Sequence, residues 1–250
     1  MTIKRNLFCL PFAGGSAAIF QPWQRLAPVD IAVHPMALPG RGTQWGQSLL
    51  CEWGPVLDLL LAQVEAQADL PSVLFGHSMG ALLAFELAHA LRERGLPAPE
   101  LLVLSASRPP RPPHRLANTP WLTCSTDCLM AELDAISGPS EALANPELRE
   151  LMLPILRNDF QLCANYRYPP RSPLQVPILV LAGGGDAGCP LAPAQAAWAQ
   201  ETTEPVTGLE IDGGHLFITE RPADVLAHVL AALPTCTRPA PPSLLNAYRS

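Results

Sequence analysis

The chain has 250 residues, of which 48% are hydrophobic and 15% are charged, so we expect one large domain with a sizeable buried core. A net charge of -6 and the lack of any basic run argue against a nucleic-acid partner. The apolar run before Pro11 is too short for a secretory signal, and no later run is long enough to cross a membrane. Seven scattered cysteines, an odd number, do not indicate a closed disulfide framework, so we expect a cytoplasmic protein.

Short apolar runs alternate with longer helix-periodic segments, a pattern typical of a mostly parallel sheet covered by helices. In chain order, the predicted strands are residues 6–10, 31–38, 72–75, 101–105, 177–182 and 206–211. The predicted crossover helices are residues 56–68, 79–94, 193–201 and 222–233. Several strands, such as LLVLS at 101–105, are almost continuously apolar, as expected when both faces of a sheet are buried. The predicted fold class is therefore α/β.

The alternation breaks after Ser107, where RPPRPPHR at 108–115 cannot form a central strand or the interior of a helix. From there to residue 173 the periodicity is helical, with apolar stripes at Leu129, Met130, Leu133 and Ile136, and at Leu148, Leu151, Met152, Ile155 and Leu156. Pro154 interrupts the second stripe, so it either kinks one helix or begins another.

We interpret residues 108–173 as a helical lid inserted into a core formed by residues 1–107 and 174–233. An ordinary set of crossover helices is the alternative interpretation of the same segment. We expect the apolar stripes of this segment to serve packing rather than binding. The proline-rich tail at 234–250 is expected to be flexible.

The sequence Gly76-His77-Ser78-Met79-Gly80 lies between the predicted strand SVLF and the amphipathic helix ALLAFELAHAL. G-x-S-x-G at a strand-to-helix turn is typical of the nucleophile turn of α/β-hydrolases. Such a turn presents the serine oxygen beyond the sheet, and the helix N-terminus places free N–H groups beside it. The alternative is a glycine-rich turn with a capping serine. We therefore predict an α/β-hydrolase fold with Ser78 as the nucleophile.

A serine nucleophile needs a positioned base, and we assign that role to His215. His215 follows a strand and two glycines, which would bring it over the sheet edge that carries Ser78. His77 precedes the serine in the turn, so its side chain should point away from the serine oxygen. The remaining histidines fall in a predicted strand, in predicted helices or in the proline-rich segment, and we expect packing or surface roles for His34, His89, His228 and His114.

An acid must hold the imidazole in the right tautomer and stabilise its charged form. Asp186 follows the strand PILVLA through three glycines, and the chain order of Ser78, Asp186 and His215 is that of the hydrolases. Asp212 is the rival, although it could cap a turn so close to His215. Asp159 falls in a helical part of the insert, where we expect a charge that faces solvent.

Attack on a carbonyl builds negative charge on oxygen, and preorganised N–H groups must meet that charge. In this architecture one donor is the amide that follows the nucleophile, here Met79. The second comes from an early strand-to-helix loop, and LPFAGGS at 10–16 is such a loop. We predict that Ala13 supplies the second N–H, the alternative being that the loop is only a glycine-rich turn.

Five stretches together resemble the type II thioesterases of nonribosomal peptide and polyketide synthases. They are LPFAGGSA at 10–17, ALPGRG at 37–42, FGHSMGALLAFELA at 75–88, LRNDFQLCANYRY at 156–168, and AGGGD through GGHLF at 182–217. The resemblance covers almost the whole chain except the proline-rich tail, and within the family it extends to siderophore-pathway members of the pyochelin type. Three positions depart from the family pattern, since Gln44, Gln47 and Asn165 stand where the family often has charged residues.

The resemblance implies hydrolysis of misprimed or stalled acyl groups from the phosphopantetheine arms of carrier proteins, without a metal or organic cofactor. Ser78 would attack the thioester, and water would then release the acyl group with His215 as base. Acyl or peptidyl carrier protein domains are the implied partners of a monomeric enzyme that binds neither nucleic acid nor membrane. Arg108, Arg111 and Arg115 could meet an acidic carrier protein, although solvated arginines in a proline-rich loop are the favoured interpretation.

Two other enzyme functions and one non-enzymatic function stay open. A fatty-acyl chain-terminating thioesterase would have a long sealed acyl tunnel, whereas a small shallow pocket would favour the editing of short acyl groups. A general carboxylesterase would carry the same triad. A non-catalytic binding protein of this fold would usually lack a triad member. Cys124 and Cys128 have the spacing of half a metal site, but no second Cys/His pair follows at a suitable spacing.

Overall fold

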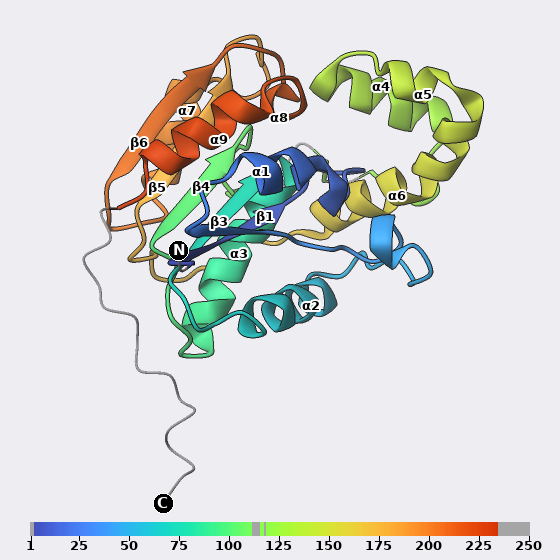
Figure 1. The fold of residues 1–250 in the computed structure, drawn as a ribbon. Helices are drawn as coiled ribbons and strands as arrows, with labels where there is room; N and C mark the ends of the chain where they lie inside the picture. Colours follow the sequence, from blue (N-terminus) through green and yellow to red (C-terminus); the bar gives the residue numbers. More distant parts are fainter. Residues whose placement is uncertain (1–2, 112–115, 118, 235–250) are drawn as a thin grey trace, which may run out of the picture.

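The expected strands form one parallel sheet in a computed structural model of the chain, which describes residues 3–111, 116–117 and 119–234 (Figure 1). The strands are β1 (Arg5–Leu10), β2 (Ile31–Pro35), β3 (Ser72–His77), β4 (Leu101–Ser105), β5 (Ile178–Gly183) and β6 (Val206–Ile211). Their order across the sheet is β2-β1-β3-β4-β5-β6, and every neighbouring pair is parallel. The predicted α/β fold with a mostly parallel sheet is confirmed. The tail from residue 235, together with His114 and Arg115, lies outside the described residues.

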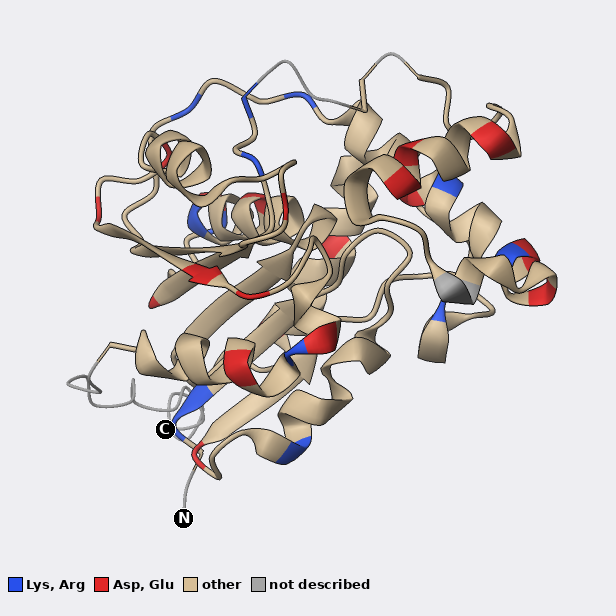
Figure 2. Cartoon of the chain, turned by 90° about the horizontal axis from the view of Figure 1, so that it is seen from above, with Lys and Arg blue, Asp and Glu red and all other residues tan. Residues whose placement is uncertain are grey.

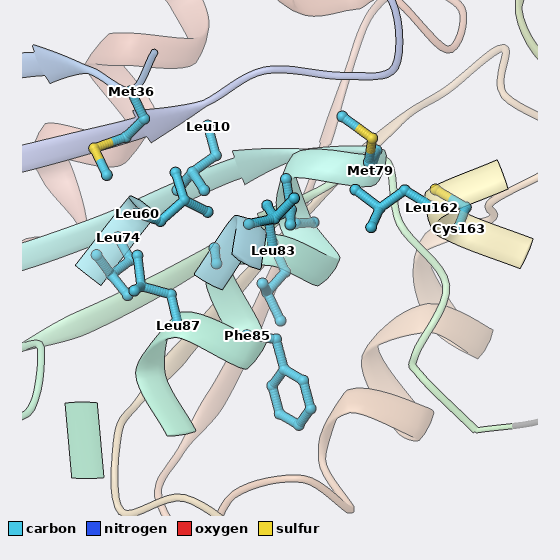
Figure 3. Packing of buried hydrophobic residues seen from close by; sticks show 14 of the residues in the cluster. Leu10, Met36, Leu60, Leu74, Met79, Leu83, Phe85, Leu87, Leu162 and Cys163 are labelled. Carbon is cyan, nitrogen blue, oxygen red and sulfur yellow. The ribbon is translucent and has the colours of Figure 1, made fainter. Parts of the chain in front are cut away.

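Helices cover both faces of this sheet (Figure 1). They are α1 (Gln21–Leu26), α2 (Trp53–Glu65), α3 (Met79–Glu93), α7 (Leu191–Trp198), α8 (Phe217–Glu220) and α9 (Pro222–Ala231), with short 3-10 turns η1 (Ala17–Phe20) and η2 (Gly42–Gln44). Alternate residues of β1 divide between two apolar cores, because successive strand side chains point to opposite faces. Phe8 and Leu10 pack with α2, α3 and α7, and Figure 3 shows part of this core. Leu7 and Cys9 pack with α1 and α9.

Strand β2 is shorter than predicted, because it ends at Pro35 instead of continuing to residue 38. Its only neighbour is β1, whose last paired residue, Cys9, lies opposite Pro35. Strand β1 ends at Leu10 and continues as a loop, so beyond this point β2 has no neighbouring strand to which it can hydrogen bond. The apolar run after Pro35 is instead buried as Met36 and Leu38.

Three helices lie between β4 and β5, and within the described residues this stretch contains no strand. They are α4 (Thr126–Ser137), α5 (Glu141–Ala144) and α6 (Pro146–Asn165). Figure 1 shows α4 and α5 projecting beyond the covered sheet. Pro154 lies inside α6, so of the two possibilities the chain forms one continuous helix. The helix begins where the Asn145 side chain accepts hydrogen bonds from two backbone N–H groups. The division of the chain into core and lid stays an interpretation.

The strand order reverses at β1, because the next strand, β2, is added on one side of it and β3 on the other. In open α/β sheets, ligands bind outside the carboxyl ends of the strands at such a point. The loop after β1, Ser78 after β3, Asp186 after β5 and His215 after β6 all follow carboxyl ends at this edge. Figure 2 shows the acidic and basic residues scattered over the ribbon, in keeping with a chain of which only 15% is charged.

Candidate active site

Ser78 occupies a strained turn between β3 and α3, with φ of 56° in the left-handed region that non-glycine residues rarely adopt. The two glycines of the motif make this turn sterically possible. A Cβ on Gly76 would lie 2.0 Å from the carbonyl oxygen of Gly80, and a Cβ on Gly80 would lie 2.2 Å from that of Leu10. The Ser78 N–H donates to the Ser105 carbonyl at 2.8 Å, which helps to hold the strained conformation.

Ser78, His215 and Asp186 form a continuous line of hydrogen bonds. His215 Nε2 lies 2.9 Å from Ser78 Oγ, and His215 Nδ1 lies 2.7 Å from Asp186 Oδ2. The His215 side chain is 10% exposed and the Asp186 side chain 2%, so the line is mostly shielded from water. In this arrangement the imidazole can accept the serine proton while the carboxylate stabilises the resulting charge.

The surroundings of Asp186 keep it ionised. Burial would raise the pKa of Asp186, but the hydrogen bond and charge of His215 and the backbone N–H groups of Gly188 and Cys189 lower it below its ordinary value. The N–H of Gly188 donates to Asp186 Oδ1 at 3.0 Å. The rival, Asp212, lies at the surface with an 83% exposed side chain and pairs with Arg221. The structure therefore brings Asp186, and not Asp212, to the imidazole.

His77 is fully buried behind the nucleophile and holds the His215 segment in place. Its Nε2 donates to the His215 carbonyl at 2.8 Å, because a carbonyl oxygen can only accept. Its Nδ1 therefore accepts from the Ser105 hydroxyl, also at 2.8 Å. Burial lowers the pKa of His77 to about 3, with the charge of His215 acting in the same direction. Sequence reasoning missed this supporting role, because it depends on a contact between segments 138 residues apart.

The two predicted oxyanion donors line the same cavity as Ser78. Met79 is the first residue of α3, where a backbone N–H has no partner inside the helix. Ala13 follows β1 in a tight turn that is closed by a hydrogen bond from the Gly15 N–H to the Phe12 carbonyl at 2.8 Å. The donor role of both amides stays a prediction.

A cavity of about 840 Å³ opens beside Ser78 and His215. Its opposite wall comes from α4 and α6, with Leu133, Ile136, Leu148, Met152, Leu156 and Phe160 among the lining residues. Both apolar stripes of this segment therefore contribute residues to the cavity wall, and the expectation that they serve packing rather than binding stays untested. Figure 3 shows Leu162 and Cys163 of α6 beside Met79. The helix α6, which forms part of this wall, therefore packs against the start of α3.

Asp159 does not face solvent as we expected from the sequence. Its side chain is 1% exposed and forms an ion pair with Arg41, whose side chain is 4% exposed. The contact lies inside the protein because this part of α6 packs against the loops that follow β1 and β2. A buried carboxylate needs such a partner, since an unpaired charge in the interior is costly. One sign in the sequence indicated that Arg41 and Asp159 act together, namely that the motifs containing them, ALPGRG and LRNDF, both carry the family resemblance.

Arg108 and Arg111 both lie exposed at the surface, as the favoured interpretation expected, and each also contacts the protein, whereas Arg115 lies outside the described residues. Arg111 Nε donates to Glu201 Oε1 at 2.6 Å, and its guanidinium lies 5.2 Å from the centre of the Tyr168 ring. Arg108 Nε donates to the Gly188 carbonyl at 2.6 Å, in the loop that carries Asp186.

The described residues hold no cluster of three or more His, Cys, Asp or Glu side chains arranged to bind a metal. Cys124 Sγ instead donates to the Trp121 carbonyl at 3.6 Å. No helix in the described part of the chain is long and apolar enough to span a membrane.

Comparison with known proteins finds relatives that match most of the length of the chain. The family model described as thioesterase domain matches residues 5–233. The gramicidin S biosynthesis protein GrsT of Aneurinibacillus migulanus is 30% identical over 218 residues, which cover 87% of this chain and 84% of GrsT. The type II thioesterase BorB from the borrelidin biosynthetic cluster superposes with a TM-score of 0.80 at 33% identity, covering 92% of this chain and 93% of BorB. YbtT, a type II thioesterase from the yersiniabactin NRPS/PKS pathway, gives 0.78 at 32% identity, covering 93% and 94%.

Proposed function

The chain belongs to the thioesterase domain family, and from that premise we propose that it removes acyl groups from the phosphopantetheine arms of synthase carrier proteins. The observation that carries this proposal is the hydrogen-bonded line of Ser78, His215 and Asp186 at the mouth of a large apolar cavity. The similarity of the chain to the type II thioesterases BorB and YbtT supports a role in a biosynthetic pathway that uses carrier proteins. The narrower resemblance to siderophore-pathway members stays a prediction.

The first half of the proposed reaction transfers the acyl group to the enzyme. Ser78 Oγ attacks the thioester carbonyl carbon while its proton passes to His215 Nε2, and Asp186 stabilises the imidazolium. The carbonyl oxygen becomes negative and accepts hydrogen bonds from the N–H groups of Met79 and Ala13. The carbon–sulfur bond then breaks, and the departing thiolate takes the proton from His215, which leaves an acyl-serine ester and a free thiol.

The second half restores the enzyme with water as the nucleophile. His215 removes a proton from water as the water oxygen attacks the ester carbonyl, and the same two N–H groups receive the oxyanion. The ester bond breaks, Ser78 regains the proton, and the acid leaves. The reaction consumes only water and needs side chains and backbone amides already in place, so the proposal includes no metal or organic cofactor.

The size of the cavity bears on the acyl group. About 840 Å³ is far more than an acetyl group needs and lies in the upper range of small-molecule pockets. The expected signature of short-acyl editing, a small shallow pocket, is therefore not what the described residues form. We infer that medium-length or bulky acyl groups are accepted.

Acyl-carrier proteins with chains of increasing length test the proposal directly. The wild-type enzyme and its Ser78→Ala variant are incubated with each, and loss of the acyl group is followed by mass spectrometry. Ser137→Ala is the matched control, because Ser137 lines the same cavity but bonds the backbone of α4 instead of His215. Equal deacylation by wild type and Ser78→Ala would refute the proposal, and equal turnover of oxygen esters would indicate a general esterase.

A further inference from the structure

A single carboxylate of α6 holds the loop that carries the predicted oxyanion donor Ala13. Asp159 Oδ2 accepts the backbone N–H of Gly14 at 2.8 Å, and the same oxygen accepts from Arg41 Nη1. Asp159 Oδ1 accepts from Arg41 Nη2 at 2.6 Å. We refer to Arg41 and Asp159 together as the clamp.

The clamp contacts the loop at two consecutive residues. Besides the Gly14 N–H bound by Asp159, Arg41 Nη1 donates to the carbonyl of Gly15 at 3.3 Å. The loop also packs directly on α6, because a Cβ on Gly14 would lie 2.6 Å from Leu156 Cδ2. Gly14 has φ of 81°, a conformation that favours glycine, so both its backbone geometry and its lack of a side chain fit this approach.

Neither Arg41 nor Asp159 lines the cavity, so neither can act on the substrate by contact. Ala13 and Gly14 both line the cavity, and Asp159 fixes the N–H of the peptide bond that joins them. The Ala13 N–H itself lies in the preceding peptide plane, whose carbonyl oxygen, that of Phe12, accepts the Gly15 N–H at 2.8 Å. Because the clamp holds Gly14 and Gly15, it restricts through this turn the direction in which the Ala13 N–H can point. An oxyanion donor is effective only when it is held in position before the charge develops.

We propose that the clamp is a positioning device, which ties α6 to the loop after β1 and thereby aims the Ala13 N–H at the thioester carbonyl. The inference rests on the proposed function and assigns Arg41 and Asp159 as positioning residues for that reaction. Because α6 also carries the cavity-lining residues Met152 and Leu156, the clamp links the acyl-binding wall to the oxyanion site. An acyl group that displaces α6 would then weaken catalysis as well as binding.

A purely structural ion pair would behave differently from a positioning device. Replacing a buried ion pair by apolar residues of similar volume is often neutral for stability, whereas removing one partner leaves an uncompensated charge. The double variant Arg41→Met/Asp159→Leu therefore separates the two roles, because it removes both charges and also both contacts with the loop. Its stability should recover relative to Asp159→Asn, while its catalytic rate should not.

The test compares wild type with Asp159→Asn, using Glu86→Gln as the matched control. Glu86 is a buried carboxylate of α3 that pairs with Arg171 and does not contact the loop. Each protein is assayed for kcat and KM on a small-thiol acyl thioester and on a p-nitrophenyl ester. Affinity for a trifluoromethyl ketone is measured as well, since its tetrahedral serine adduct places an oxyanion against the two donors.

We expect Asp159→Asn to lower kcat on both substrates by about 10²-fold with little change in KM. Ketone affinity should fall by a comparable factor, whereas Glu86→Gln should keep both. Recovery of kcat together with stability in the double variant, or normal kcat and ketone affinity in Asp159→Asn, would overturn the inference while leaving the proposed function intact. A wild type that releases the acyl group neither from these two substrates nor from acyl-carrier proteins would overturn the proposed function and the inference with it.

Discussion

Replacing His77 by glutamine should change how the stability of the protein depends on pH. Glutamine retains an N–H group that can donate to the His215 carbonyl, but it does not titrate. In the native protein His77 is neutral, because Nε2 donates to that carbonyl and Nδ1 accepts from Ser105. Protonation of Nδ1 would place a positive charge in the core, away from water, which is why burial lowers the pKa of His77.

The size of the effect follows from the pKa of His77 in the two states. Folding lowers it from an ordinary 6.5 to about 3, so between these pH values the unfolded chain binds one more proton than the native protein. The free energy of unfolding therefore falls as the pH drops below 6.5, by about 1.36 kcal/mol for each pH unit. At pH 5 this single residue should account for about 2 kcal/mol of lost stability.

Urea unfolding of wild type and His77→Gln at pH 7.5 and pH 5 measures this difference. Between the two conditions the wild type should lose about 2 kcal/mol more than the variant, whatever the absolute stability of either protein. His89, whose pKa burial also lowers to about 3, is present in both proteins and cancels in the comparison. Equal losses in the two proteins would refute the reasoning, since they would show that His77 titrates alike in both states.

Three further predictions test other parts of the site. Asp186→Asn should reduce kcat by about 10⁴-fold on a thioester substrate, whereas Asp212→Asn should leave it near the wild-type value, and the reverse pattern would exchange their roles. Gly80→Ala should lower the free energy of unfolding by about 3 kcal/mol, because its Cβ would lie 2.2 Å from the Leu10 carbonyl oxygen, and an unchanged melting temperature would contradict that contact. Met152→Trp should fill part of the cavity, so kcat/KM should fall for long acyl groups and persist for acetyl, and a uniform loss across chain lengths would argue against acyl binding there.

The sequence predicted those parts of the molecule that depend on local pattern. Short apolar runs identified the six described strands, and four of them, β1, β3, β4 and β5, are buried along their whole length. Ser78 could be placed from its two glycines together with their position between a strand and a helix. The structure shows the reason in the contacts that any larger residue would make at Gly76 and Gly80. His215 and Asp186 were found through their positions after β6 and β5, since carboxyl ends of parallel strands meet at one edge.

Features that depend on distant pairing could not be predicted in this way. Asp159 and Arg41 are separated by 118 residues, and neither neighbourhood indicates that the other charge lies against it. A single charged residue on a predicted helix favours a solvent-exposed position on statistical grounds, and that inference failed because tertiary packing decides burial. The contact of His77 with the His215 carbonyl escaped prediction for the same reason, since a backbone acceptor leaves no trace in the sequence.

Residues that depart from the family pattern make contacts that need no charge, whereas the shared motifs contain a buried ion pair. Gln44 and Gln47, which stand where the family often has charges, hydrogen bond to each other at the surface. Asn165 at the end of α6 donates to the Cys51 carbonyl at 2.9 Å, a contact that needs no charge. Arg41, by contrast, is buried against Asp159, so its charge cannot be removed alone without leaving a buried carboxylate unpaired. LPFAGGSA, ALPGRG and LRNDF, which carry the family resemblance, are therefore in contact in the structure. The second and third segments hold the first, the loop after β1, through hydrogen bonds of Arg41 and Asp159.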